Sequence, residues 1–196
     1  MSSSVYADLI RPTRRGTAVL YDASLIAGFS LVIALCSQVA IPLPFTPVPV
    51  TLQTFAILLT GCLLGGGRGA LSVVLYVAEG SVGLPFFSGG TGGIAHLLGP
   101  TGGYLLGFAL CAYSVGLFAA RGLTRTWPGR LLALAVADLV IYVPGVAWLG
   151  AFTGMSKAFS LGFVPFIVGD ALKIAAGCGL LSAVALMTAR IRSRST

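Results

Sequence analysis

One segment of this chain combines a membrane-like composition with a pair of opposite charges. Residues 162–189 are apolar except for Asp170 and Lys173, which stand in the sequence Gly169-Asp-Ala-Leu-Lys173. A charged side chain at bilayer depth costs several kcal/mol unless it is paired or faces a polar cavity. Residues at i and i+3 share one face of a helix, so these two charges can pair there. This face is therefore suited to a polar ligand.

The composition excludes a water-soluble globular fold. Only 9% of the residues are charged and 57% are hydrophobic, whereas soluble domains carry about 25% charged residues. We therefore expect an all-α integral membrane protein, a multi-pass protein of the cell membrane. The net charge of +7 includes no basic stripe interleaved with aromatic residues, so no nucleic-acid partner is expected.

The apolar segments predict six transmembrane helices in a single domain over residues 19–190. The predicted spans are about 19–41, 50–64, 68–80, 101–120, 130–149 and 162–189. The second and third are shorter than the ~20 residues that a spanning helix needs. Pro144-Gly145 is expected to kink or shorten the fifth.

The connections between the spans have distinct compositions. Residues 42–49 are proline-rich and should be extended, because proline lacks the N–H that a helix needs. Gly65–Gly67 predicts a tight turn. Residues 81–99 are too apolar for a solvated linker and too glycine-rich for a helix, which suggests a lid or re-entrant cover. Residues 151–160 are expected to form a second outer loop.

The arginines predict the orientation, because cytoplasmic loops are enriched in Lys and Arg. In a six-span arrangement one side carries Arg11, Arg14, Arg15, Arg68, Arg121, Arg125, Arg130, Arg190, Arg192 and Arg194. The opposite side carries Lys157 and His96. The tails 1–18 and 191–196 are therefore expected in the cytoplasm. Long outer loops would then cap a pocket that opens outward.

Four stretches together resemble one family. They are Pro47-Val-Pro-Val-Thr-Leu-Gln-Thr54, Gly83-Leu-Pro-Phe-Phe-Ser-Gly-Gly-Thr-Gly-Gly93, Leu98-Gly-Pro-Thr-Gly-Gly-Tyr-Leu-Leu-Gly107 and Gly169-Asp-Ala-Leu-Lys173. In combination they resemble the BioY family, the biotin-specific substrate-binding (S) component of energy-coupling-factor (ECF) vitamin transporters. The resemblance covers about residues 19–189.

The resemblance implies a six-helix protein that binds biotin from outside with high affinity and delivers it inward with an ATP-hydrolysing ECF module. The implied partners are a transmembrane coupling protein, two cytosolic ATPases and the lipid bilayer. Biotin is the transported substrate, and no cofactor is expected. The resemblance also implies that Asp170 and Lys173 contact the vitamin.

The chemistry of the two residues agrees with that role. A carboxylate can accept hydrogen bonds from the ureido N–H groups of biotin, and a lysine can donate to a carbonyl or a carboxylate. The sequence leaves open which end of biotin each residue meets. The alternative is that Asp170 and Lys173 form a structural intramembrane salt bridge.

Three polar residues at the outer ends of spans are further candidates for substrate binding. Thr51 and Gln53 lie at the start of the second span, and Gln53 is one of two glutamines in a chain without asparagine. Glu79 ends the third span, where it either accepts from the ureido group or forms a solvated helix end.

The apolar part of a bicyclic ligand needs an apolar wall. Phe86, Phe87 and Tyr104 are the candidates for it. Gly90, within the glycine-rich loop, is expected to permit close approach of the backbone. His96 is expected to be an outer-loop residue without ligand contact.

Two further features concern partners and the inner half of the membrane. Ala23 and Ala27 lie one turn apart in the first span, where small residues let helices approach closely. In the resembled family such a face meets the coupling protein. Asp138 is expected either to join a polar core network or to lie at a partner contact.

No catalytic or metal site is indicated, so the chain is not expected to be an enzyme. Residues 61–69 lack the Lys-Ser/Thr ending of a phosphate-binding loop. The cysteines, which show no metal-binding spacing, are Cys36, Cys62, Cys111 and Cys178. Ser156 and His96 suggest an intramembrane protease only weakly, because nothing completes a triad.

A self-sufficient carrier of biotin or another small vitamin is the alternative function. It would be ion-coupled, with Asp138, Asp170 or Glu79 as the titrating group. No repeat of broken helices supports this alternative.

The predicted orientation can be tested by cysteine accessibility. In a variant whose native cysteines are replaced, Ser88→Cys and Ser160→Cys are each expected to react with a membrane-impermeant maleimide added outside intact cells. Both positions belong to the predicted outer loops. Reaction from the cytoplasmic side alone would contradict the orientation.

Overall fold

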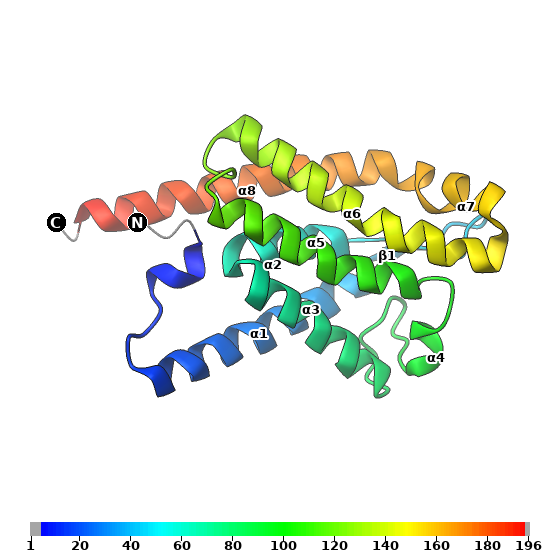
Figure 1. Ribbon diagram of the computed structural model, residues 1–196, viewed down its shortest axis with the longest axis horizontal. Helices are drawn as coiled ribbons and strands as arrows, with labels where there is room; N and C mark the ends of the chain where they lie inside the picture. Colours follow the sequence, from blue (N-terminus) through cyan, green and yellow to red (C-terminus); the bar gives the residue numbers. More distant parts are fainter. Residues whose placement is uncertain (1–4, 195–196) are drawn as a thin grey trace.

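A helix lies in each of the six predicted spans (Figure 1). These helices are α1 (Arg15–Gln38), α2 (Gln53–Leu64), α3 (Gly66–Ser81), α5 (Gly102–Ala120), α6 (Trp127–Thr153) and α8 (Ile167–Arg194). The computed structural model describes the backbone of residues 5–194 and the side chains of residues 5–189. The outermost parts of the predicted tails, 1–4 and 195–196, lie outside the described residues. The described chain is all-α apart from one short hairpin, as predicted.

Not all of these helices have the length of a membrane span. Within the described residues, four helical stretches are long and apolar enough to cross a membrane, namely α1, α5, α6 and residues 155–189. Helices α2 and α3 have 12 and 16 residues, fewer than the ~20 of a spanning helix. A single residue, Gly65, separates them, and its φ of +84° is accessible to glycine at little cost. The predicted tight turn is therefore confirmed.

The prediction of an outer loop over residues 151–160 is wrong. Helix α6 continues to Thr153, Gly154 turns the chain with a φ of +82°, and α7 (Met155–Gly162) follows directly. Pro144 lies inside α6 without ending it, so the fifth helix is not shortened. Ala158 of α7 is fully buried, and packing against α6 stabilises this short helix.

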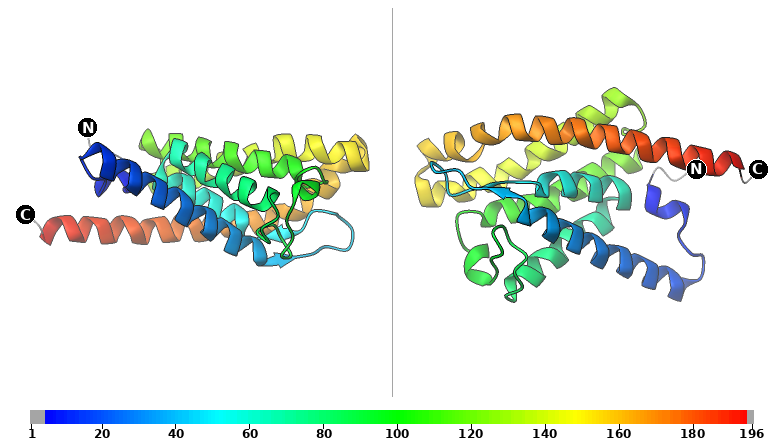
Figure 2. Two further views of the ribbon diagram at one scale, coloured as in Figure 1. Left: turned by 90° about the horizontal axis from the view of Figure 1, so that it is seen from below. Right: turned by 180° about the vertical axis from the view of Figure 1, so that it is seen from behind.

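Helix α5 packs against α2, α3 and α6, and it lies between α3 and α6 in the view of Figure 1 (Figure 2 shows the same helices from two other sides). Its contacts with α2 and α3 depend on glycines. A Cβ on Gly61 would lie 2.3 Å from the carbonyl oxygen of Ala112, and one on Gly116 would lie 2.2 Å from the amide nitrogen of Gly66. Small residues at helix crossings allow the backbones to approach this closely. Helix α8 packs against α6 and α2, whereas α1 lies at the periphery against α2 and α3.

The amino-terminal segment folds back onto the bundle. Its 3₁₀ helix η1 (Tyr6–Leu9) contacts α2, and Ala7 is buried. Arg68, at the start of α3, forms ion pairs with Asp8 at 2.7 Å and with Asp22 at 2.9 Å. Helix α1 begins at Arg15 rather than at residue 19, so the described part of the predicted tail is largely structured.

The ends of the described chain lie at the same end of the bundle, together with the α5–α6 connection (Figure 1). The opposite end carries the antiparallel strands β1 (Ala40–Ile41) and β2 (Val50–Thr51), the short helix α4 (Ile94–Leu97) and α7. Residues 42–49 join the strands without helix, as their prolines predict. Thr46 in this connection donates to the carbonyl of Leu161 at 2.9 Å, which ties the loop to the end of α7.

Candidate functional site

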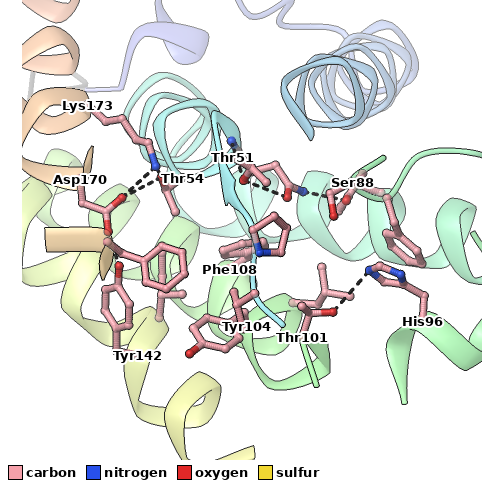
Figure 3. Close-up of a pocket in the computed structure, with 18 residues that line it drawn as sticks. Thr51, Thr54, Ser88, His96, Thr101, Tyr104, Phe108, Tyr142, Asp170 and Lys173 are labelled. Carbon is pink, nitrogen blue, oxygen red and sulfur yellow. Dashed lines mark hydrogen bonds and ion pairs between the residues drawn. The ribbon is translucent and has the colours of Figure 1, made fainter. Parts of the chain in front are cut away.

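A pocket of about 570 Å³, partly continuous with the outside, lies toward the end of the bundle opposite the termini. Helices α2, α3, α5, α6 and α8 contribute to its wall, and so do the strand β2 and the glycine-rich connection between α3 and α5 (Figure 3). Five helices therefore converge on one site, although their residues are far apart in the sequence.

One end of the pocket holds a closed cluster of polar groups (Figure 3). The Lys173 ammonium lies 2.9 Å from the Asp170 carboxylate and donates to the Thr54 hydroxyl at 2.8 Å. The Thr54 hydroxyl also lies 3.3 Å from Oδ1 of Asp170, and the Tyr142 hydroxyl donates to Oδ2. The exposed fractions of the Lys173 and Asp170 side chains are 11% and 6%, so the pair is largely removed from solvent.

The cluster retains capacity to bind a ligand. A lysine ammonium has three N–H donors, and Thr54 and Asp170 accept two of those of Lys173. The Asp170 carboxylate can accept about four hydrogen bonds, and three described side chains donate to it. One N–H of Lys173 and acceptor capacity of Asp170 therefore remain unused by the described side chains.

A second polar group of the pocket wall lies on α2 and α3. Gln53 is buried, and its amide nitrogen donates to the Tyr76 hydroxyl at 2.7 Å. The Thr51 hydroxyl lies 3.3 Å from the Gln53 amide oxygen. These contacts hold the amide in one orientation at the wall.

Aromatic rings form much of the rest of the pocket wall. Phe87 is fully buried, meets Tyr76 edge to face at 5.7 Å and stacks on His96 at 4.7 Å. On the other side Tyr104 meets Tyr142 edge to face at 6.3 Å. Flat rings of this kind form the apolar walls that small-molecule sites use.

His96 belongs to this aromatic wall. Its ring nitrogens lie 3.1 Å from the Thr91 hydroxyl and 3.4 Å from the Thr101 hydroxyl. Burial lowers the pKa of the His96 side chain below the usual value of a histidine, because desolvation disfavours the charged imidazolium. His96 therefore presents a neutral ring to the pocket at neutral pH. It lies in the connection between α3 and α5, and its lack of ligand contact stays a prediction.

A second, wider cavity lies outside the pocket, and we call it the vestibule. It encloses about 1140 Å³ between the 42–49 loop and the glycine-rich connection and includes open solvent. Pro49, Ser88, His96 and Thr101 line both spaces. These four residues therefore form the threshold between the vestibule and the pocket.

The structure brings six of the predicted site residues together at the pocket wall. They are Thr51, Gln53, Phe87, Tyr104, Asp170 and Lys173. Three others lie outside this lining. Phe86 packs against the hydrophobic core, and the N–H of Gly90 donates to the side chain of Gln38. Glu79 also lies outside, with one buried carboxylate oxygen that has no hydrogen-bond partner among the described residues.

The two alanines predicted to meet a partner lie away from the pocket. Ala23 and Ala27 are exposed on the outer side of α1. Asp138 is buried on α6 and lines a separate side pocket between α6 and α8, next to Tyr142 and Asp170. Its Oδ1 has no hydrogen-bond partner among the described residues, so it does not join the polar cluster directly.

Sequence reasoning missed several residues of the wall. Thr54 follows Gln53 directly, and Tyr76 precedes Glu79 by one helical turn, so both could have been found by extending the predicted faces. Tyr142 has no such local signal, because its contact with Asp170 depends on the packing of α6 against α8.

The fold and the pocket together define a membrane protein that encloses a small-molecule site between its helices. The sequence profile of the BioY family matches residues 11–190. The chain therefore belongs to the BioY family.

Two relatives are similar in sequence to this chain over most of its length. A protein of Pyrococcus horikoshii, described as "Probable biotin transporter BioY", is 42% identical over 79% of this chain and 90% of its own. The biotin transporter BioY of Thermotoga maritima is 44% identical over 68% of this chain and 79% of its own. The crystal structure of the S-component for biotin from an ECF-type ABC transporter superposes with a TM-score of 0.78. It is 27% identical to this chain and covers 89% of this chain and 95% of its own.

Asp170 and Lys173 are expected to contribute to the free energy of unfolding as a pair and not independently. Lys173→Met is expected to lower the free energy of unfolding by about 3 kcal/mol, because it leaves the Asp170 carboxylate buried without its cation. Asp170→Asn combined with Lys173→Met should lower the free energy of unfolding by less than Lys173→Met alone, because no unpaired charge is left buried. Denaturant titration of the detergent-solubilised variants measures this. A double variant as unstable as the sum of the single variants would show that the charges act independently.

Proposed function

We propose that this protein is the high-affinity biotin-binding membrane component of a vitamin uptake transporter. The observation that carries the proposal is the pocket itself, in which a paired Asp170 and Lys173 face an aromatic cavity. The relatives described as biotin transporters support the choice of ligand. Binding and movement are the whole activity in this proposal, with no bond made or broken and no cofactor.

The polar groups of the pocket complement those of biotin. The ureido ring offers a carbonyl acceptor flanked by two N–H donors. The remaining N–H of Lys173 suits the carbonyl, and the remaining acceptor capacity of Asp170 suits an adjacent N–H. Phe87 and Tyr104 supply apolar surface for the fused rings.

We assign the ureido end of biotin to the charge pair and the carboxylate tail to the vestibule. The Asp170–Lys173 pair has no net charge, so it suits the neutral ureido ring. A carboxylate loses much more hydration free energy on burial than a neutral group does. The tail is therefore more stable near the threshold, where Ser88, His96 and Thr101 adjoin a cavity that is open to solvent.

In this proposal the chain crosses the cell membrane six times and forms a single domain over residues 19–190. Both tails are cytoplasmic, and the loops at the pocket end are outside. Support comes from the ion pairs of Arg68 with Asp8 and Asp22, which join this arginine to the amino-terminal segment. Cations gathered at one end agree with the positive-inside rule.

The proposed partners are a transmembrane coupling protein and two cytosolic ATPases. The superposition on an ECF-type S-component supports this assignment. The exposed positions of Ala23 and Ala27 support α1 as the docking helix, because small residues allow another helix to approach.

Biotin titration of the purified chain tests the proposed function. Trp148, which donates to the carbonyl of Gly99 at the vestibule, supplies a fluorescence signal close to the site. We expect a dissociation constant below micromolar. Asp170→Asn combined with Lys173→Met should weaken binding about 100-fold or more, because two hydrogen bonds to charged groups are lost.

The matched control is Lys157→Met, which removes an exposed lysine on α7 and should bind like the wild type. Affinity weaker than micromolar in the wild type would count strongly against biotin as the ligand. Unchanged binding in the double variant would mean that the charge pair is only structural.

The docking face is tested by co-purification with a co-expressed coupling protein. Ala23→Leu combined with Ala27→Leu is expected to abolish co-purification, because the added side chains prevent close helix approach. Biotin binding should be unaffected, since both residues lie away from the pocket. Gly179→Leu on α8, where a side chain meets open space, is the control for an added leucine. Loss of biotin binding would instead indicate an internal packing role.

A further inference from the structure

Two side chains at the carboxyl-terminal end of α1 form hydrogen bonds with the glycine-rich connection between α3 and α5. The Gln38 amide nitrogen lies within 3.3 Å of the carbonyl oxygens of Pro85, Phe86 and Phe87. Its amide oxygen accepts from the N–H of Gly90 at 2.9 Å. The Ser37 hydroxyl, which is fully buried, lies within hydrogen-bond distance of the carbonyls of Phe86 and Ala34, and its single proton can go to one of them. We call Ser37 and Gln38 the latch.

An amide suits this position for a chemical reason. The loop presents carbonyl acceptors on one side and an N–H donor on the other, and a glutamine side chain carries both complementary groups. A carboxylate would keep the acceptor for Gly90 but would place an oxygen against the carbonyls. The two glycines at the loop tip, Gly89 and Gly90, have φ values of +74° and +69°, which favour glycine.

The gripped loop carries part of the substrate site. Phe87 is the buried ring between Tyr76 and His96, and Ser88 belongs to the threshold between vestibule and pocket. Two of the carbonyls that face Gln38, those of Phe86 and Phe87, directly precede and follow the α-carbon of Phe87 along the chain. The latch therefore joins the backbone of this wall to α1, in addition to the bridge of Phe87 to Thr91.

Gln38 is exposed at the vestibule, so water competes with its contacts and the latch can open. Helix α1 is otherwise joined to the bundle by α2, α3 and the ion pairs of Asp22 at its other end. The outward side of α1 carries Ala23 and Ala27. One peripheral helix thus connects the proposed docking face to the wall of the pocket.

We propose that Ser37 and Gln38 are positioning residues for substrate, which hold the Phe87–Ser88 wall closed against the ligand and tie that wall to α1. The inference rests on the proposed function for the identity of the ligand. In this proposal the latch acts on the loop, although Gln38 also lines the vestibule. The latch acts by slowing the escape of a bound molecule across the threshold.

The test combines ligand kinetics with backbone hydrogen exchange. Gln38→Glu should raise the dissociation rate of biotin about tenfold, because it removes hydrogen bonds to the loop. Gln38→Met, which adds no charge at the vestibule, should have the same effect and separates loss of these bonds from repulsion of the biotin carboxylate. In the absence of biotin, the amides of residues 83–93 should exchange faster with deuterium, since the loop opens more often. The thermal midpoint of the ligand-free protein should change little. Val39→Ala, at an exposed neighbour with 58% relative exposure, is the control.

The outcomes separate the latch from the proposed function. Unchanged exchange over residues 83–93 in Gln38→Glu would overturn the proposal. Faster exchange with an unchanged dissociation rate would also overturn it, because the latch would then be structural only. If Gln38→Glu does not fold, Ser37→Ala replaces it with the same two readouts. If the wild type fails to bind biotin, the proposed function fails, and hydrogen exchange still decides whether the latch holds the loop.

Discussion

The ion pair between Asp170 and Lys173 organises the pocket end of this protein. Its two members belong to α8, yet Thr54 from α2 and Tyr142 from α6 complete their hydrogen bonds. Breaking a buried pair by removing one partner typically costs about 3–5 kcal/mol. Three helices are therefore held at one point by electrostatics, in a bundle whose other contacts are mostly apolar. The aromatic walls and the threshold are arranged around that point.

The sequence predicted the helices well because their signals are local. Hydrophobic runs, the prolines after α1 and the glycine between α2 and α3 act through the backbone of the residues themselves. The error at residues 151–160 has a tertiary cause. A short glycine- and serine-containing stretch looks like a loop, but burial of Ala158 against the bundle stabilises α7. Pro144 removes one donor from a helix of 27 residues, which continues past it.

The candidate site was predictable to the extent that its residues share one element. Asp170 and Lys173 stand one turn apart on a single helix, so their pairing is visible in the sequence. Tyr142 donates a hydrogen bond to Asp170 only because α6 packs on α8, and no local sequence pattern predicts that hydrogen bond. The sequence predicts that Gly90 permits close approach of the backbone, and in the structure its N–H donates to the side chain of Gln38. An exposed glutamine at a helix end gives no sequence signal of such a role.

The shortness of α2 and α3 has a consequence for the surrounding lipid. At 1.5 Å per residue, helices of 12 and 16 residues extend about 18 and 24 Å, against a hydrocarbon core of about 30 Å. Helices α6 and α8 are much longer, so the hydrophobic height differs from one flank of the protein to the other. A bilayer responds to such mismatch by thinning locally, and a protein responds by tilting, at a modest cost per ångström. Because α2 is almost entirely buried, the demand for local thinning is expected beside α3 rather than beside α6 and α8.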